Sequence, residues 1–324
     1  MTTFTFHSTM ADRMETFVAL RRLAGTDYQS QTRLLVYFDN FLEKERFDKP
    51  FLSREIIQRY FSSLSHLHPR TQYNRFSIIN QFCRYLSRAQ PLCYLPEAIG
   101  AAKSETSRIP YIFTKRQILN LLAEAANLQP QPSLRPHTYR TLLGLLYTTG
   151  IRIGEALALN IKDFYPESTR LHIRKGKFHK SRWVPLAPST CTILQNYIHN
   201  RHNVMPSAED TPLFISLKLR RLSHCTVHQT FCDLLKQCRI HKGKGHGPRI
   251  HDLRHTFAVH RLVQWYGDGQ DINARLPALA TYMGHVGVGS TQIYIQATAE
   301  LSEQAHQRFL RYVRNNKITK GGLS

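Results

Sequence analysis

Three segments near the start of the chain repeat apolar side chains at steps of three and four residues. This is the spacing of one face of an α-helix. The segments cover residues 28–45, 53–67 and 71–89. In the last segment Tyr73, Phe76 and Ile79 fall on one face. The pattern predicts three helices whose apolar faces form the core of an all-helical domain.

The pattern also indicates where domains begin and end. Residues 1–25 carry only weak helical signals, whereas prolines and a polar run interrupt the periodicity near residue 100. Thr114 and Gln117 form a capping-box signature, which is typical of a helix start. The expected organisation is an N-terminal segment (1–25), a helical domain (26–100), a linker (101–113) and a second domain (114–324).

The second domain combines helical and strand-like patterns. An apolar helix over 137–149 should end at Gly150, and a short helix should start at Ile153. Strands are expected at 161–164, 170–174 and 182–186, and further helices at 188–200, 226–238, 252–266, 276–283, 291–297 and 301–314. The predicted fold class is mainly α with a small antiparallel β-sheet.

Charge points to a polyanionic partner. The chain has 44 Lys and Arg against 22 Asp and Glu, a net charge of +22. Residues 111–324 hold 29 of the 44 basic side chains and only 12 of the 22 acidic ones. Such an excess is most often the footprint of nucleic acid. No membrane span or signal peptide is found, and six dispersed cysteines fit a reduced, cytoplasmic protein without membrane contact.

Two segments carry candidate anion-binding groups. In Thr149-Gly-Ile-Arg-Ile-Gly-Glu155, Arg152 lies between a helix end and a helix start, and Glu155 is placed to orient it. On its own such an arginine is usually an ordinary surface residue. The predicted hairpin over 170–182 carries six basic residues and no acid, so it either contacts phosphates or is simply a solvated turn.

Two further segments contain imidazole and phenol groups. His251 and Arg254 are three residues apart, so they would share a helical face, and such a pair can activate a phosphate. His285 follows Gly284 in a predicted turn, and Tyr294 lies in the next short helix. Taken singly, each feature has an ordinary structural explanation. Together they supply a nucleophile, dispersed positive charge and a proton donor without a metal.

The order of these motifs resembles that of the tyrosine recombinases, also called phage integrases. The segments GIRIGEAL, GKFHKSRWVPL, HDLRHTFAVH and YMGH…STQIYI are similar to family motifs. The similarity is strong over about 115–300, and residues 26–95 match the family's helical, SAM-like core-binding domain only in pattern. The stretch between Arg254 and His285 is longer than in simple family members, so the resemblance does not extend to its local geometry.

The resemblance implies DNA cleavage and rejoining through a 3′-phosphotyrosyl bond. Tyr294 would be the nucleophile, and Arg152 and Arg254 would hold the non-bridging oxygens. His251 and His285 would assist charge stabilisation and proton transfer. Lys177 would protonate the leaving 5′-oxygen, and it is preferred to Lys175 and Lys180 because Gly176-Lys177 matches the family hairpin. Glu155 would be a supporting residue.

The expected partner is double-stranded DNA, with a homo- or hetero-tetramer on paired sites. The candidate DNA-contacting residues are Arg70, Arg75, Arg84, Arg174, Lys175, Lys180 and Arg182. Alternative functions are a type IB topoisomerase-like or resolvase-like strand transferase, or a catalytically silent DNA-binding protein. No cofactor and no metal are expected. Cys225-x-x-His228 and Cys238-x-x-His241 resemble half-sites for zinc, but Cys238 falls on an apolar helical stripe.

Overall fold

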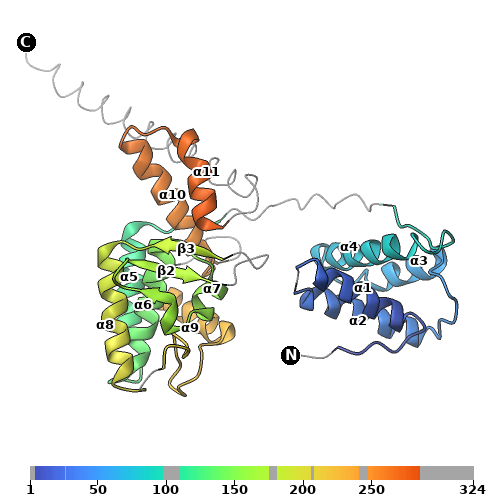
Figure 1. Cartoon of the computed structure of the whole chain (residues 1–324), viewed down its shortest axis with the longest axis horizontal. Helices are drawn as coiled ribbons and strands as arrows, with labels where there is room; N and C mark the ends of the chain where they lie inside the picture. The colour runs from blue at the N-terminus through green and yellow to red at the C-terminus, as the bar shows by residue number, and fades with distance from the viewer. Residues whose placement is uncertain are drawn as a thin grey trace, which may run out of the picture. The chain divides into compact units, whose positions relative to one another are not determined.

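The computed structural model describes residues 4–25, 27–97, 110–174, 181–205, 208–240 and 247–284. The chain divides into two compact units, residues 1–109 and 110–324, each with its own core (Figure 1). The expected helices over 291–297 and 301–314 lie outside the described residues. None of the described helices is long and apolar enough to cross a membrane.

The first unit is helical over its described residues. Its helices are α1 (Ala11–Leu23), α2 (Gln29–Lys44), α3 (Arg54–Ser63) and α4 (Pro69–Leu86). The last three lie where the apolar periodicity predicts them. Phe38 on α2, Ile57 on α3 and Phe82 on α4 are fully buried or nearly so, and they belong to one hydrophobic core.

The N-terminal residues differ from their expectation, because α1 is part of this core. Met10, Met14 and Phe17 are among the most deeply buried side chains of the unit. The buried Asp39 carboxylate on α2 accepts hydrogen bonds from the backbone N–H groups of His7 (2.7 Å) and Ser8 (3.1 Å). The segment 1–25 is therefore not separate over its described part. Its buried residues have helical spacing, but the exposed Leu20 and Leu23 weaken the apolar face that the sequence shows.

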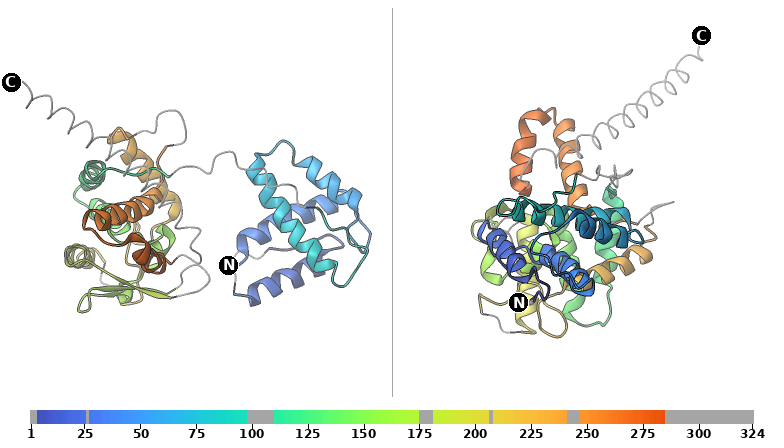
Figure 2. Two further views of the ribbon diagram at one scale, coloured as in Figure 1. Left: turned by 90° about the horizontal axis from the view of Figure 1, so that it is seen from above. Right: turned by 90° about the vertical axis from the view of Figure 1, so that its right-hand side faces the viewer.

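The second unit has seven described helices and one sheet. The helices are α5 (Lys115–Ala126), α6 (Leu134–Thr149), α7 (Ile153–Ala158), α8 (Pro188–His202), α9 (His224–Gln237), α10 (Asp252–Gly267) and α11 (Ile272–Met283). Helix α6 packs against α5, α8 and α10 and lies at the centre of the unit. Helices α10 and α11 lie side by side (Figures 1 and 2).

The sheet is antiparallel in the order β1-β2-β3, formed by Phe164–Tyr165, Arg170–Ile173 and Arg182–Pro185. Leu171 pairs with Val184, and both side chains are fully buried. The first expected strand, 161–164, is mostly wrong, because Ile161–Asp163 is a 3-10 turn. The Asp163 carboxylate accepts from the Asn160 backbone N–H (2.9 Å), which favours a turn over an extended strand.

The start of the second unit overlaps the end of the expected linker. Phe113 is fully buried, and its backbone N–H donates to Thr256 Oγ1 on α10 (3.0 Å). Residues 110–113 therefore belong to the second unit, while 98–109 lie outside the described residues. The capping box is confirmed: Thr114 Oγ1 accepts from the Gln117 N–H (3.2 Å), and Gln117 Oε1 accepts from the Thr114 N–H (2.9 Å).

Helix α6 ends at Gly150 as predicted, for two physical reasons. Gly150 has φ of 62°, the left-handed conformation that favours glycine at a helix end. A Cβ at this position would also lie 2.3 Å from Cδ1 of Phe257 on α10. The close approach of α6 and α10 brings the end of one helix beside the first turns of the other.

Candidate active site

Arg152 and Glu155 form a local unit at the start of α7. Arg152 is the residue that caps the helix, and its backbone N–H donates to Glu155 Oε2 (2.9 Å). Its Nη1 donates to Glu155 Oε1 (2.9 Å). Because Glu155 is buried and bound at both oxygens, the Arg152 side chain is held in one direction. This is the orienting role that the three-residue spacing predicts.

Arg254 reaches the same region from α10. Its side chain is 2% exposed, so most of its charge is removed from water. Nη1 donates to the Gly150 carbonyl (2.6 Å) and Nη2 to the Met283 carbonyl (2.7 Å). Those carbonyls end α6 and α11, and the last carbonyls of a helix lack partners within it. Arg254 therefore joins three helices.

The end of α11 is bound by three arginines at three consecutive carbonyls. Tyr282 O accepts from Arg182 Nε (3.1 Å), Met283 O from Arg254 (2.7 Å), and Gly284 O from Arg152 Nη2 (2.8 Å). Cations are favoured at a helix C-terminus because the helix dipole places partial negative charge there. The arrangement brings three guanidinium groups together from α7, β3 and α10.

Glu155 is the acid that balances part of this charge. Burial raises its pKa, but hydrogen bonds from Arg182 and from the Arg152 backbone outweigh that effect, and both guanidinium charges add to them. The pKa of Glu155 falls to about 2 as a result. The nearby Asp252 carboxylate is bound to Arg249 instead. The cluster of Arg152, Arg182 and Arg254 thus keeps an excess of positive charge, which favours an anionic ligand.

His251 lies beside this cluster, at the residue before α10. Burial lowers its pKa, and the charges of Arg254 and Arg249 lower it further. Its ring lies edge-on to that of His255, with centroids 5.0 Å apart. A histidine with a lowered pKa is neutral at pH 7, so it can accept a proton. The three-residue spacing to Arg254 spans the start of the helix rather than its interior.

Several predicted site residues lie outside the described residues. They are Lys175, Lys177, Lys180, His285 and Tyr294. Glycine at position 284 has φ of 70° and closes α11, as expected for the residue before His285. The described part of the site therefore contains Arg152, Glu155, Arg182, His251 and Arg254.

The candidate DNA-contacting arginines fall into two groups. Arg70 and Arg84 on α4 are exposed, and Arg84 Nε donates to Asn80 Oδ1 (3.0 Å) on the same helix. Arg75 is half-buried, with its guanidinium 4.3 Å from the centroid of the Tyr37 ring. Arg174 pairs with Asp163. Arg70, Arg84 and Arg174 are thus all exposed to solvent, whereas Arg75 is half-buried.

Arg182 is bound to other parts of the second unit. Its Nη1 and Nη2 donate to Glu155 Oε1 (3.0 Å) and Oε2 (2.8 Å), and its side chain is 15% exposed. Its segment, 170–182, contains no acid, so the sequence pattern favoured a solvent-facing charge. The acid comes instead from α7, 27 residues earlier, and no local spacing signals such a pairing.

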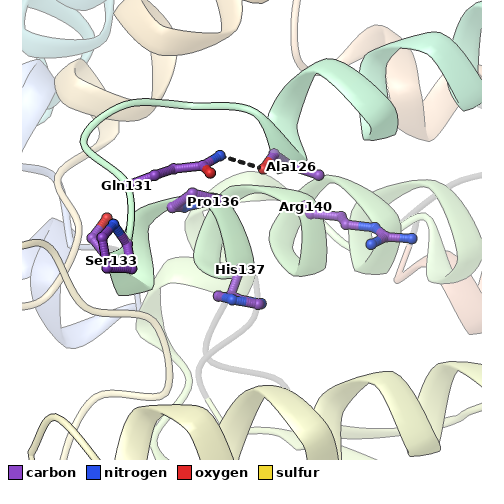
Figure 3. A pocket seen from close by; sticks show the side chains of 7 residues that line it. Ala126, Gln131, Ser133, Pro136, His137 and Arg140 are labelled. Carbon is purple, nitrogen blue, oxygen red and sulfur yellow. Dashed lines mark hydrogen bonds between the residues drawn. The ribbon is translucent and has the colours of Figure 1, made fainter.

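Other candidate sites are weaker. A pocket between the end of α5 and the start of α6 is lined by Ser133, Pro136, His137 and Arg140, and Gln131 Nε2 donates to Ala126 O beside it (3.0 Å) (Figure 3). None of the candidate site residues lines it. Among the described residues, no three His, Cys, Asp or Glu side chains are grouped to hold a metal. His241 of the zinc hypothesis is outside that range.

Comparisons with known proteins agree with the motif order. Residues 112–300 match the phage integrase family. A protein that carries the name integrase/recombinase in Sinorhizobium fredii is 35% identical, over 94% of this chain and 98% of its own. The tyrosine recombinase XerC of Alcanivorax borkumensis is 30% identical over 75% of each chain.

Solved structures show the same fold at lower identity. The Tn1549 transposon integrase in complex with transposon right-end DNA has a TM-score of 0.64 at 15% identity, covering 91% of this chain and 98% of that one. The XerH recombinase bound to its difH substrate has a TM-score of 0.62 at 19% identity, covering 85% and 78%. The family match, the curated relatives and the shared fold lead to one conclusion: the chain belongs to the phage integrase family, the tyrosine recombinases.

Proposed function

We propose that this protein is a site-specific DNA recombinase that cuts and rejoins strands through a 3′-phosphotyrosyl intermediate. The observation that carries the proposal is the convergence of Arg152 and Arg254 on adjacent carbonyls at the end of α11. Two guanidinium groups held side by side suit the two non-bridging oxygens of one phosphodiester. The family to which the chain belongs is one of site-specific recombinases.

The reaction needs no external energy source. The Tyr294 oxygen attacks phosphorus, and the bond from phosphorus to the 5′-oxygen breaks. Arg152 and Arg254 stabilise the charge that spreads over the non-bridging oxygens. The phenolic proton passes to a neutral imidazole, for which the lowered pKa of His251 is suited. Lys177 gives a proton to the leaving 5′-oxygen, and His285 adds a hydrogen bond to the phosphate.

Rejoining reverses these steps with a different strand. The 5′-hydroxyl of a partner duplex attacks the phosphotyrosyl bond, and the Tyr294 oxygen leaves with its proton restored. The phosphodiester energy is conserved in the covalent bond, so ATP is not required. Two such exchanges on paired duplex sites require four active sites, hence a tetramer on DNA.

Tyr282 lies near the cluster, and its setting disfavours it as the nucleophile. Its hydroxyl donates to the Pro185 carbonyl (3.4 Å), and its ring stacks on Phe257 at 5.8 Å. Burial raises the pKa of Tyr282 to about 12, although the Arg261 and Arg182 charges lower it in part. A phenol with a raised pKa ionises less readily, and this one already has an acceptor.

The test is covalent trapping on a nicked half-site, which lets the cleaved 5′ fragment diffuse away. The wild-type chain should form a protein–DNA adduct. Tyr294→Phe should bind DNA with unchanged affinity and form none, while Tyr282→Phe should still form it. An adduct with Tyr294→Phe would identify another nucleophile. Relaxation of supercoiled DNA without paired sites would favour a topoisomerase, and binding without any adduct would favour a silent DNA-binding protein.

The role of Lys177 has its own test. A 5′-alkoxide needs a proton as it leaves, whereas a thiolate does not, because thiol pKa values are about 8.5. Lys177→Ala should cleave ordinary DNA about 10²–10⁴-fold more slowly. It should recover much of that rate on DNA with sulfur at the bridging 5′ position. Lys175→Ala and Lys180→Ala serve as controls, and equal defects on both substrates would place the acid elsewhere.

A further inference from the structure

Among the candidate DNA-contacting residues that the structure describes, Arg182 makes the most hydrogen bonds to other elements of the protein. It begins β3, and its guanidinium donates through three nitrogens to two other elements. Nη1 and Nη2 bind both oxygens of Glu155 on α7, and Nε binds the Tyr282 carbonyl at the end of α11. A planar guanidinium suits such a fork, since its donors are fixed relative to one another.

These contacts leave Arg182 little capacity to bind DNA directly. The side chain is 15% exposed, compared with 24% for Arg152, and its partners are a buried carboxylate and a backbone carbonyl. Turning it toward a phosphate would leave the Glu155 carboxylate with one fewer cation in a buried setting. Leaving a buried charge short of partners is costly, so the internal pairing is favoured.

Glu155 passes the effect of Arg182 to Arg152. The same carboxylate accepts from the Arg152 backbone N–H (2.9 Å) and from its Nη1 (2.9 Å). With both oxygens also bound to Arg182, the carboxylate cannot rotate without breaking several hydrogen bonds. The direction of the Arg152 guanidinium therefore depends on Arg182, although no contact between the two arginines is needed.

The end of α11 lies close to the Arg182 guanidinium. Gly284 has φ of 70°, and a Cβ there would lie 3.1 Å from both Cζ and Nη1 of Arg182. A side chain at position 284 would therefore press on the Arg182 guanidinium, in addition to straining the backbone. His285 follows Gly284 directly in the sequence.

We infer that Arg182 is a positioning residue for strand cleavage, which acts by fixing Glu155, and through it Arg152, against the end of α11. The inference rests on the proposed function, because it assigns Arg182 a part in that reaction. It replaces the direct DNA contact that the basic hairpin segment suggested. Arg182 shapes the site in the absence of DNA, and its bonds persist when a phosphate binds.

The experiment compares Arg182→Met with the wild-type chain in two measurements. The first is the single-turnover rate of covalent complex formation on the nicked half-site at saturating protein. The second is half-site affinity as a function of salt. We expect cleavage to slow by about 10²-fold, the effect of a misplaced catalytic group. We expect affinity to change less than about threefold, with an unchanged salt slope. Arg182→Lys should recover part of the rate, because one ammonium can bind Glu155 but cannot also span to Tyr282 O.

A double variant tests whether Arg182 acts through Glu155. If it does, Arg182→Met with Glu155→Gln should cleave no more than about threefold more slowly than the slower single variant. Arg221→Met is the matched control, because Arg221 donates to the Leu157 (2.7 Å) and Leu159 (3.1 Å) carbonyls at the end of α7 without touching Glu155. It should lower the melting temperature and leave cleavage within about threefold.

Three results would overturn the inference. Weaker DNA binding with a salt slope reduced by about one would make Arg182 a phosphate contact. Unchanged cleavage in Arg182→Met, at a temperature where it is folded, would make its role purely structural. If the rate losses of the two single variants multiply in the double variant, Arg182 does not act through Glu155. Failure of the wild-type chain to form any adduct would instead overturn the proposed function itself.

Discussion

Two arginines of the first unit and two of the second are used in opposite ways. On α4 of the first unit, Arg70 and Arg84 are exposed and make few contacts with the protein. In the second unit, Arg182 and Arg254 are largely buried and bind carbonyls or a carboxylate. An exposed arginine adds to long-range attraction for DNA, whereas a buried one holds a fixed geometry. In the proposed reaction, we therefore expect the first unit to contribute mainly affinity and the second mainly reaction rate.

The largest effect is expected from Arg254→Ala. It removes the donor to Gly150 O and Met283 O, and it removes a guanidinium from the proposed phosphate site. Cleavage should fall by at least ~10³-fold, in line with the loss of a transition-state donor. Stability should fall by about 2–3 kcal/mol, the value of hydrogen bonds to a charged group. Arg84→Ala on α4 is the matched change, and comparable losses in both variants would abolish the contrast.

The two units can also be compared by the loss of stability when a glycine with positive φ is replaced by alanine. Gly150→Ala places a Cβ 2.3 Å from Phe257 and also strains the backbone, so we expect a loss of about 2–5 kcal/mol. Gly25→Ala in the first unit has φ of 81° but open space around it. Only the conformational cost of about 1 kcal/mol should remain there. Chemical denaturation measures both, and equal losses would show that the contact with Phe257 relaxes.

Acid should weaken the second unit through Glu155. Its folded pKa is about 2, below the ordinary value of 4.5, so the unfolded chain binds the proton more tightly. The stabilisation is therefore complete above about pH 4.5 and is lost as the pH falls toward 2. Glu155→Gln should reduce the pH dependence of the unfolding free energy in this window. If the two curves stay parallel, the carboxylate does not carry the effect.

The smallest effects are expected from single changes on α4. Arg70→Ala and Arg84→Ala should each weaken half-site binding and reduce the slope of log K against log salt by about one. The cleavage rate at saturating protein should change by less than about twofold. A slower cleavage rate at saturating protein would mean that the first unit also helps to position the reacting groups.

The elements that depend on local spacing could be predicted from the sequence, whereas contacts between residues distant in the chain could not. Helices with apolar faces and the capping box of Thr114 were predictable, because they depend on residues a few positions apart. Helix α1 and the 3-10 turn at Ile161–Asp163 were not, because packing on α2 and α4 decides the first and a side-chain cap decides the second. Arg152 and Arg254 stood out from their spacing to Glu155 and His251, and the resemblance to family motifs supplied their expected roles. The pairing of Arg182 with Glu155 joins residues distant in sequence, which no pattern along the chain reveals.

The three carbonyls at the end of α11 have a consequence for inhibitor design. In this site the arginines already hold oxygen atoms, and these belong to the protein's own peptide groups. Because the peptide oxygens take up donors of each guanidinium, a small competing anion would meet fewer donors than an unengaged arginine offers, and it would bring few contacts of its own. Compounds that bind the folded site should therefore need a second point of attachment, beyond the group that mimics phosphate.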